Sequence, residues 1–200
     1  MSNLAIAVAT YIAYLFGSVS SAIIVCKLMG LPDPRTTGSR NPGATNVLRI
    51  GGKKAALITL LGDMLKGVIP VLVATWWGFD SLGVSLVLLG AFLGHLFPIF
   101  FRFEGGKGVA TALGGLLALY WPIGLSWIAT WLVVAGIFRY SSLAAMTASL
   151  LVPFYTWFLT KNLTYVVTIS VISLILILRH HANIRKLWRG EESKIGKKKV

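Results

Sequence analysis

Long apolar runs without a charged residue recur along the chain and restrict what it can fold into. The first run covers residues 4–26, which contain no Asp, Glu, Lys or Arg. At about 1.5 Å per residue in a helix, such a run can cross a hydrocarbon core of about 30 Å. No basic segment precedes it and no clean cleavage site ends it, so we expect a retained span rather than a signal peptide.

Six further apolar runs follow, and polar segments separate them. The candidate spans are residues 4–26, 55–77, 82–101, 109–121, 125–138, 141–160 and 163–178. The fourth and fifth are short and are also compatible with one kinked, re-entrant pair. The pattern predicts an all-α, polytopic integral membrane protein with seven transmembrane helices. Because no long linker or repeat interrupts it, we expect residues 1–200 to form a single membrane domain.

The composition argues against the other broad classes of protein. Hydrophobic residues make up 56% of the chain and charged residues only 12%, whereas a typical soluble domain has about 25% charged residues. Disordered chains are less hydrophobic than this one. Cys26 is the only cysteine, which excludes a disulfide scaffold. A net charge of +13 is typical of nucleic-acid binding in a soluble protein, but in a membrane protein its placement matters more, and we expect no nucleic-acid partner.

Basic residues concentrate on one side of the expected membrane topology. With the N-terminus outside, the only basic residue in an outer loop is Lys161. The segments on the cytoplasmic side hold Lys27, Arg35, Arg40, Arg49, Lys53, Lys54, Arg102, Lys107, Arg139 and the basic tail. The positive-inside rule therefore supports an outside N-terminus and a cytoplasmic C-terminus. We expect the terminal Lys197, Lys198 and Lys199 to meet anionic headgroups, at about 1 kcal/mol per residue.

Polar and glycine-rich motifs gather on the same predicted cytoplasmic side. They are residues 17–22, 38–46, 62–67, 94–98, 104–111 and 180–183. The outer loops carry nothing comparable. An enzyme that takes one substrate from the lipid and another from the cytosol would need a one-sided polar cluster of this kind.

The run Gly105, Gly106, Lys107 and Gly108 has two interpretations. Glycines let a backbone approach a ligand closely, successive N–H groups can bind an anion, and a helix that begins at Val109 would add its positive dipole end. The spacing is not that of a P-loop. A tight turn between helices with a snorkelling lysine explains the same residues equally well.

The loop around Ser39 has a similar double interpretation. Arg49 has the fork geometry that suits a phosphate, and Ser39 and Asn46 are suited to bind hydroxyl groups. Turn formation and the positive-inside bias explain these residues at least as well. For Ser21, close helix packing is the more economical explanation, because small residues line helix interfaces in membranes.

Ionisable residues inside the expected spans are few. Asp63 and Lys66 lie three residues apart within a span, which favours a structural ion pair that supports the first loop. His95, near the end of an apolar run, is typical of a hydrogen-bonded core residue.

Histidines also follow the last run. His180 and Asn183 share a face if the helix continues past residue 178, and His181 points elsewhere. No zinc-type His or Cys spacing occurs, so we expect no metal site.

Taken together, these motifs resemble a known family. Gly17-Ser18-x-x-Ser21-Ala22, residues 38–46, Asp63-x-x-Lys66-Gly67, Gly94-His95-x-x-Pro98, Gly105 to Thr111 and His180-x-x-Asn183-Ile184 occur in order over nearly the whole chain. Their order and spacing resemble the bacterial acyl-phosphate:glycerol-3-phosphate acyltransferases.

The resemblance implies an enzyme of the bacterial inner membrane, with seven spans and an active site that faces the cytoplasm. Such an enzyme moves a fatty acyl group from acyl phosphate to the 1-hydroxyl of sn-glycerol 3-phosphate, which gives lysophosphatidic acid and phosphate, the first step of phospholipid synthesis. It needs no cofactor or metal, works with membrane lipid, and is compatible with coupling to an enzyme that produces acyl phosphate.

The resemblance also implies roles for individual residues. The expected catalytic residues are Ser39, Lys107, His180 and Asn183. The expected substrate-binding residues are Arg49, Asn46, Gly105, Gly106, Gly108, Ser21 and Glu192. Two positions depart from the family: Arg40 stands where Gly is common, and Glu104 where a basic residue is common. An acidic Glu104 would weaken anion binding unless it points away or pairs with a neighbour such as Arg102.

Two other classes of function remain as alternatives. A transporter for a phosphorylated small molecule would place its site near the middle of the bilayer, often between inverted repeats, and no repeat is visible. A purely structural membrane protein would leave the glycine-rich basic loops on one side unexplained.

Overall fold

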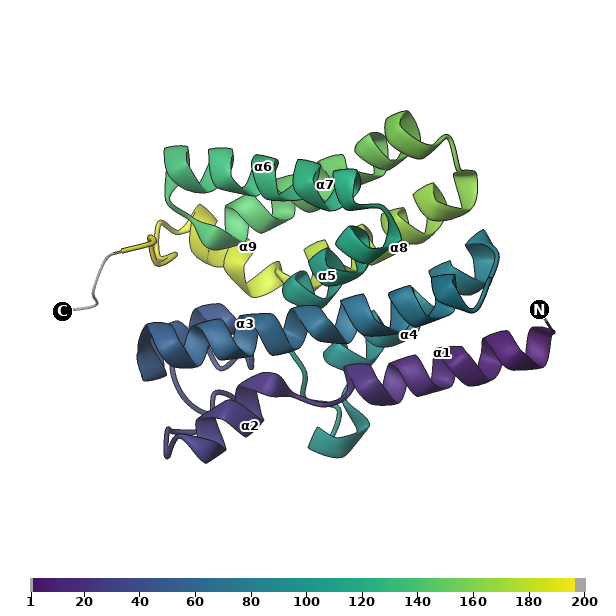
Figure 1. Ribbon diagram of the computed structural model, residues 1–200. Helices are drawn as coiled ribbons and strands as arrows, with labels where there is room; N and C mark the ends of the chain where they lie inside the picture. Colours follow the sequence, from purple (N-terminus) through teal and green to yellow (C-terminus); the bar gives the residue numbers. More distant parts are fainter. Residues whose placement is uncertain (1, 197–200) are drawn as a thin grey trace. The chain divides into compact units, whose positions relative to one another are not determined.

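A computed structural model describes residues 2–196, and within them every regular element is a helix (Figure 1). The expected all-α class is therefore confirmed for the described residues. The expectation for Lys197, Lys198 and Lys199 lies outside them. The fold divides into two compact units, Met1–Leu119 and Tyr120–Val200, and each is described by itself.

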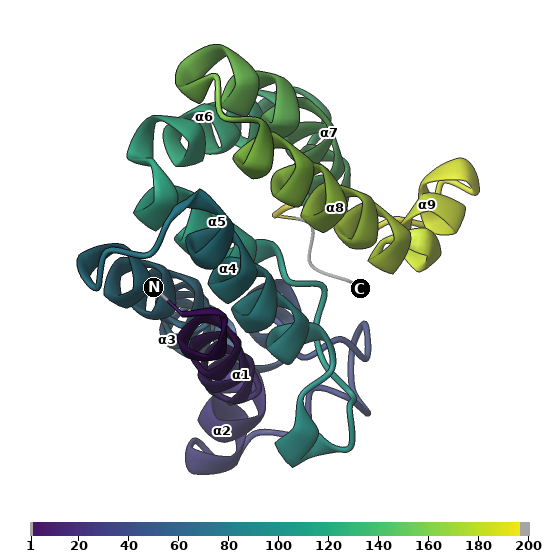
Figure 2. The same ribbon diagram turned by 90° about the vertical axis from the view of Figure 1, so that its right-hand side faces the viewer.

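The first unit is built from packed helices, and its pair α1 and α4 runs parallel, because Gly90 lies against Thr10 and Gly94 against Tyr14. Its elements are α1 (Asn3–Gly17), α2 (Ser21–Leu28), α3 (Ala44–Trp76), α4 (Ser81–Leu96), the short 3-10 helix η1 (Ile99–Phe101) and α5 (Val109–Leu119). Helix α1 packs along α4, and α3 packs along both α5 and α2 (Figure 2). Helix α4 begins at a cap in which Asp80 Oδ1 accepts a hydrogen bond from Gly83 N at 2.8 Å.

The second unit packs consecutive helices against each other. Its elements are α6 (Trp121–Phe138), α7 (Ser141–Thr160), α8 (Leu163–Arg179) and α9 (His181–Trp188). Helix α7 contacts both α6 and α8. Helices α6 and α7 end at Arg139 and Lys161, both in the left-handed conformation that stops a helix. Asn162 Oδ1 then caps α8 by accepting from Tyr165 N at 3.2 Å.

Most of the predicted spans coincide with helices long enough to cross a bilayer. Five of them pass by length and composition: Asn3–Leu28, Ala44–Trp76, Ser81–Phe101, Trp121–Phe138 and Ser141–Thr160. The bent pair α8 and α9 raises the number to six if it is counted as one span. Helix α5, with 11 residues, reaches only about 16 Å. The membrane-spanning character is thus clear, and the count of seven remains a prediction.

The first predicted span is broken where the sequence shows only a continuous apolar run. Residues 18–20 separate α1 from α2, and Ser20 adopts an extended conformation. Ser18 Oγ bonds back to the Tyr14 carbonyl at 2.8 Å. Lys66 Nζ, from α3, donates to the freed carbonyl of Val19 at 2.9 Å. A carbonyl opened inside an apolar segment needs such a partner, so a distant lysine makes the break possible.

Helix α3 begins earlier than the sequence pattern predicts. Residues 44–51 are helical although they belong to the stretch 27–54 that was expected to be a polar loop. Gly52 has φ 76° and ψ −173°, and this kink separates them from the apolar remainder of the helix. A left-handed φ is readily available to glycine, which explains why the helix changes direction at this residue.

Glycines set the close approach of the helices in the first unit. A Cβ added at Gly17 would lie 2.1 Å from the Ala91 carbonyl oxygen on α4. A Cβ added at Gly67 would lie 2.0 Å from the Thr111 carbonyl oxygen on α5. The expected packing role of small residues is confirmed at these crossings.

Candidate active site

Two loops of the first unit meet at the C-terminal end of α4. The first loop covers residues 29–43, and the glycine loop covers residues 102–108. A Cβ added at Gly106 would lie 3.1 Å from the Pro42 carbonyl oxygen, which shows how closely the two loops approach. The unit therefore brings together two motifs that are more than sixty residues apart in the sequence.

A three-residue ion cluster also joins the two loops. Arg35 Nη2 lies 2.7 Å from Asp33 Oδ2, and Arg35 Nη1 lies 3.3 Å from Glu104 Oε2. Glu104 thus pairs with Arg35, rather than with the expected neighbour Arg102. The hydrogen bonds from Arg35 lower the pKa of the Asp33 carboxyl below its ordinary value. The side chain of Glu104 is therefore tied to the first loop.

Asn46 holds the first loop in shape. Its side chain is 1% exposed. Nδ2 donates to the carbonyls of Pro34 and Thr37, both at 2.9 Å, and Oδ1 accepts from Ser39 N at 2.8 Å. Three hydrogen bonds engage both donors and the acceptor oxygen of this amide. The structure therefore gives Asn46 a clear part in positioning Ser39.

Ser39 and Arg49 are exposed, and Ser21 packs against another helix. Ser39 follows Gly38, which has φ 68° and leaves no room for a Cβ beside Asn46 Oδ1. Arg49 lies on the first helical segment of α3, before the kink at Gly52. A Cβ added at Gly62 on α3 would lie only 2.7 Å from Ser21 Oγ on α2. The Ser21 side chain therefore packs closely against α3.

Every glycine of the glycine loop has a packing reason. A Cβ at Gly105 would lie 2.2 Å from the His95 carbonyl oxygen, and one at Gly106 would lie 2.3 Å from His95 Nε2. Gly108 has φ 83°, and a Cβ there would lie 2.2 Å from Phe92. Gly106 N also donates to the His95 carbonyl at 3.2 Å. The glycines pack closely onto the end of α4, and the half-buried Lys107 is the one residue with a side chain between Gly105 and Gly108.

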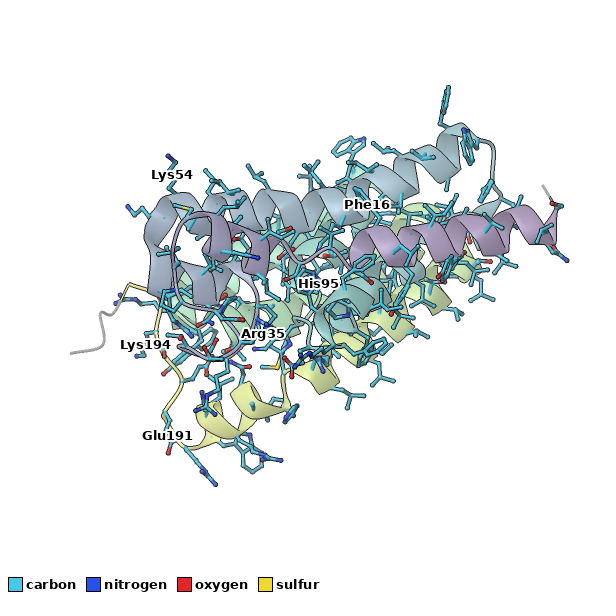
Figure 3. All side chains as sticks on the ribbon, turned by 90° about the horizontal axis from the view of Figure 1, so that it is seen from below. Phe16, Arg35, Lys54, His95, Glu191 and Lys194 are labelled. Carbon is cyan, nitrogen blue, oxygen red and sulfur yellow. The ribbon has the colours of Figure 1, made fainter. Side chains whose placement is uncertain are left out.

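A buried polar network lies beneath the glycine loop, at the position marked by His95 in Figure 3. Asp63, Lys66 and His95 are 2%, 4% and 7% exposed. Lys66 Nζ lies 2.8 Å from Asp63 Oδ1 and 3.0 Å from His95 Nδ1. The predicted ion pair and the hydrogen-bonded His95 are both confirmed. The pair supports the helix break and the glycine-loop side, rather than the first loop as expected, because Lys66 bonds to Val19 and His95.

The expected residues of the second unit form a network of their own. Glu192 Oε1 accepts from Asn183 Nδ2 at 2.7 Å and from Ser142 Oγ at 2.6 Å. His180 is 2% exposed, and its Nδ1 lies 2.8 Å from the Leu176 carbonyl. A carbonyl can only accept, so Nδ1 carries the proton. The helix bends by 54° at His180 instead of continuing straight, and Asn183 N donates to the His180 carbonyl at 2.8 Å.

The sequence pattern missed two residues that the structure places beside the expected ones. Arg35 ties Asp33 to Glu104, and the local spacing Asp33-Pro34-Arg35 is a signal that could have indicated half of this cluster. Ser142 bonds to Glu192 from 50 residues away, and no local pattern indicates such a pair. Among residues 2–196, no group of three or more His, Cys, Asp or Glu side chains could hold a metal ion.

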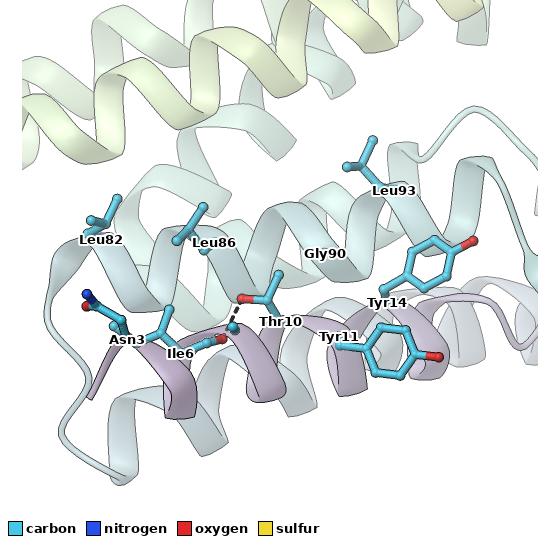
Figure 4. A pocket seen from close by; sticks show the side chains of 10 residues that line it. Asn3, Ile6, Thr10, Tyr11, Tyr14, Leu82, Leu86, Gly90 and Leu93 are labelled. Carbon is cyan, nitrogen blue, oxygen red and sulfur yellow. Dashed lines mark hydrogen bonds between the residues drawn. The ribbon is translucent and has the colours of Figure 1, made fainter. Parts of the chain in front are cut away.

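A groove of about 570 Å³ runs between α1 and α4 in the first unit (Figure 4). Aliphatic and aromatic side chains dominate its walls, which are formed by Asn3, Ile6, Ala7, Thr10, Tyr11, Tyr14, Leu82, Leu86, Gly90 and Leu93. Tyr14 donates its hydroxyl to the Phe97 carbonyl at 2.8 Å. One end of the groove therefore lies two residues from His95, where the glycine loop rests on α4.

Comparison with known proteins places this chain in a family. The family model described as glycerol-3-phosphate acyltransferase matches residues 7–190. The chain belongs to the glycerol-3-phosphate acyltransferase family. Proteins of that name from Thioalkalivibrio sulfidiphilus and Pasteurella multocida are 58% and 53% identical to it. The matches cover 93% and 94% of this chain, and 92% of each relative.

The fold is shared with solved members of this glycerol-3-phosphate acyltransferase family. Crystal structures of PlsY, an integral membrane glycerol 3-phosphate acyltransferase, superpose with TM-scores of 0.92 and 0.89, at 38% and 36% identity, over 96% of both chains. They are the glycerol 3-phosphate form and the lysophosphatidic acid form of that protein. The expectation of a multi-pass membrane acyltransferase is therefore confirmed at the level of the family.

Proposed function

We propose that this protein transfers a fatty acyl group from acyl phosphate to the 1-hydroxyl of sn-glycerol 3-phosphate, with lysophosphatidic acid and phosphate as products. The family supports the acyl acceptor, since PlsY has been crystallised in its glycerol 3-phosphate and lysophosphatidic acid forms. The observation that supports the proposal is the contact of the first loop with the glycine loop, the two segments to which Ser39 and Lys107 belong.

The proposed site combines the residues named from the sequence. Lys107 and Arg49 hold phosphate groups by charge, and Gly105, Gly106 and Gly108 shape the loop around one of them. Ser39 orients the attacking hydroxyl, and the family resemblance implies catalytic roles for Asn183 and His180 of the second unit as well. Asn46 positions Ser39, and Glu192 orients the Asn183 amide. Ser21 contributes by packing α2 against α3, at the edge of the first loop.

The proposed chemistry is a direct transfer. The glycerol 3-phosphate hydroxyl oxygen forms a bond to the acyl carbonyl carbon, the bond from that carbon to the phosphate oxygen breaks, and the hydroxyl proton passes to a substrate phosphate oxygen. Acyl phosphate is already activated, so positioning and charge neutralisation supply most of the catalysis. The apolar groove between α1 and α4 accommodates the acyl chain. An acyl ester on Ser39 after exposure to the donor alone would contradict this mechanism.

The proposed setting is a bacterial inner membrane. Residues 1–200 act as one domain, with seven spans, an outside N-terminus, and a cytoplasmic C-terminus and active site. The one-sided distribution of basic residues supports this orientation. An enzyme that produces acyl phosphate acts before it, and the two can be functionally coupled.

The test uses purified protein in lipid cubic phase. Palmitoyl phosphate and glycerol 3-phosphate are supplied, phosphate and lysophosphatidic acid are followed together, and palmitoyl-CoA is tried in parallel. We expect both products from acyl phosphate only, and a loss of at least about 100-fold in rate for Lys107→Ala. A folded sample that is silent with acyl phosphate would contradict the proposal, and activity with palmitoyl-CoA would contradict the choice of donor.

A further inference from the structure

His95 lies between the buried ion pair and the glycine loop. On one side its Nδ1 is 3.0 Å from Lys66 Nζ. On the other side its Nε2 occupies the space that a side chain at position 106 would need. The backbone repeats this connection, because Gly106 N donates to the His95 carbonyl at 3.2 Å. One residue therefore touches both the interior of the unit and the loop above it.

The contacts of Lys66 determine the protonation of the His95 ring. An ammonium group has three N–H donors and no acceptor. Lys66 donates to the Val19 carbonyl at 2.9 Å and forms an ion pair with Asp63 Oδ1 at 2.8 Å, and its hydrogen bond with His95 Nδ1 at 3.0 Å is a donation from the ammonium group. Nδ1 must therefore accept, and it carries no proton. The separation of 3.7 Å between His95 Nδ1 and Asp63 Oδ1 is then not an ion pair.

A neutral ring with a bare Nδ1 carries its proton on Nε2. The N–H of Nε2 thus faces Gly106, at a place where the chain has no side chain. Asp63 fixes Lys66, Lys66 fixes the ring, and the ring reaches the loop. All three side chains are buried, so water competes little with these contacts.

We propose that His95 is a positioning residue, whose Nε2–H, held in place by Lys66 and Asp63, keeps the glycine loop in the shape that binds a substrate phosphate group. This proposal rests on the proposed function, because that function supplies the phosphate group that the glycine loop binds. The competing explanation is that His95 only satisfies Lys66, in which case its Nε2–H has no part in binding.

Two substitutions separate these explanations. The Oδ1 of Asn overlays the Nδ1 of histidine, so His95→Asn keeps an acceptor for Lys66 and loses the group at Nε2. The amide of Gln reaches the place of Nε2, so His95→Gln keeps an N–H donor there. His181→Asn is the matched control, because His181 is exposed and lies on α9, outside the proposed site.

The measurements are kcat and KM for glycerol 3-phosphate and for palmitoyl phosphate. We expect His95→Asn to raise KM for one of the two by about tenfold or more with kcat within about threefold, and His95→Gln to raise the same KM clearly less, because it keeps an N–H donor near the loop although it loses the acceptor for Lys66. We expect no change for His181→Asn. Parental values for His95→Asn, or equal impairment of both His95 variants, would overturn the proposal. If the parent protein transfers no acyl group, the proposed function has failed instead.

A measurement on the parent protein covers the case in which a variant does not fold. The chain has three histidines, so 15N-histidine labelling gives few signals, and the His181→Asn spectrum removes one of them. We expect the His95 ring to show a protonated Nε2 and a bare Nδ1, and its Nε2 signal to move when inorganic phosphate is added. A proton on Nδ1, or an unmoved Nε2 signal, would overturn the proposal.

Discussion

Arg40 has a backbone conformation that costs energy for a residue with a side chain. Its φ of 55° lies in the left-handed region, which is favourable for glycine and unfavourable for a residue with a Cβ. The family commonly has Gly at this position, as the sequence resemblance implies. The backbone geometry therefore accounts for the family residue, whereas the arginine in this chain is tolerated because its side chain is exposed.

We predict that Arg40→Gly stabilises the protein. Removing the Cβ relieves the left-handed backbone, and the expected gain is about 0.5–1 kcal/mol, visible as a higher unfolding temperature. Arg40→Ala is the control, since it removes the charge but keeps the Cβ. An equal shift in both variants would assign the effect to charge instead.

The ion cluster of Asp33, Arg35 and Glu104 leads to a prediction about pH. Hydrogen bonds from Arg35 lower the pKa of Asp33 from its ordinary value of 3.8. A lowered carboxyl pKa adds stability that is fully present above the unfolded-state value and is lost as the pH falls through the folded-state value. The effect is small, because Asp33 is about one-third exposed.

Comparing the parent with Asp33→Asn tests this linkage. We expect the parent to unfold at a higher temperature than the variant at neutral pH, and the difference to shrink as the pH falls below about 4 and to vanish only below the lowered folded-state pKa of Asp33. A difference that persists unchanged at low pH would show that the carboxylate charge has no part in the stability of the loop.

The sequence predicts side-chain contacts between residues that are close together in the chain. The spacing of Asp63 and Lys66 predicted an ion pair, and it is present at 2.8 Å. The other partners of Lys66 were out of reach, because Val19 and His95 are 47 and 29 residues away. Their contacts depend on how α1, α3 and α4 pack, which hydropathy does not specify.

At the scale of helices, the crossing of α3 and α5 depends on residues without side chains. Gly67 meets the Thr111 carbonyl oxygen, and Gly114 meets the Met64 carbonyl oxygen. Thr111 Oγ1 also donates to the Asp63 carbonyl at 2.9 Å. The two helices therefore approach backbone to backbone, which is the close packing that small residues permit in membranes.

We predict that Gly67→Ala destabilises the first unit by about 1–3 kcal/mol or more, because the new Cβ meets backbone atoms that cannot move aside. Gly136→Ala on α6 is the matched control, since nothing lies within 4 Å of a Cβ there. Thermal unfolding in detergent measures both. Equal unfolding temperatures for the two variants would contradict the close crossing.

The elements themselves were predictable to different degrees. The predicted run 141–160 coincides with α7 (Ser141–Thr160), because polar residues mark both of its ends. The break between α1 and α2 was missed, because the residue that satisfies it belongs to another helix. The early start of α3 was missed too. Residues 44–51 lie before the kink at Gly52, and they lack the continuous apolar character of the rest of the helix.

At the scale of the whole molecule, charge placement predicts which ends face the cytoplasm. Lys161, which follows α7, belongs to an outer loop in this topology, and Lys194 belongs to the cytoplasmic tail. The topology therefore predicts that position 161 is accessible from outside the cell and that position 194 is not. Cys26 is buried, so single cysteines can be introduced in a Cys26→Ala background.

We predict that an impermeant maleimide labels Lys161→Cys in intact cells, and that Lys194→Cys reacts only after the membrane is opened. The physical reason is the retention of basic segments on the cytoplasmic side during insertion. Labelling both variants from the same side would contradict a single span between Lys161 and the tail. The reverse pattern would invert the topology.

The fold class and the membrane location could be predicted from hydropathy, because apolar runs have no other stable environment. The composition of the site was predicted mainly through motif order and spacing. The roles of Arg35, Ser142 and His95 emerged only from three-dimensional contacts, since each acts on a residue in a different segment.

The lysine that closes the break in the first span also has a consequence for biogenesis. As the chain leaves the ribosome, Val19 enters the membrane before Lys66, and His95 enters later. When α3 is inserted, the Asp63 carboxylate and the Val19 carbonyl are already available to the Lys66 ammonium group. Only the His95 imidazole is still missing. A chain halted before residue 95 would therefore leave the buried ammonium group without one of its three partners.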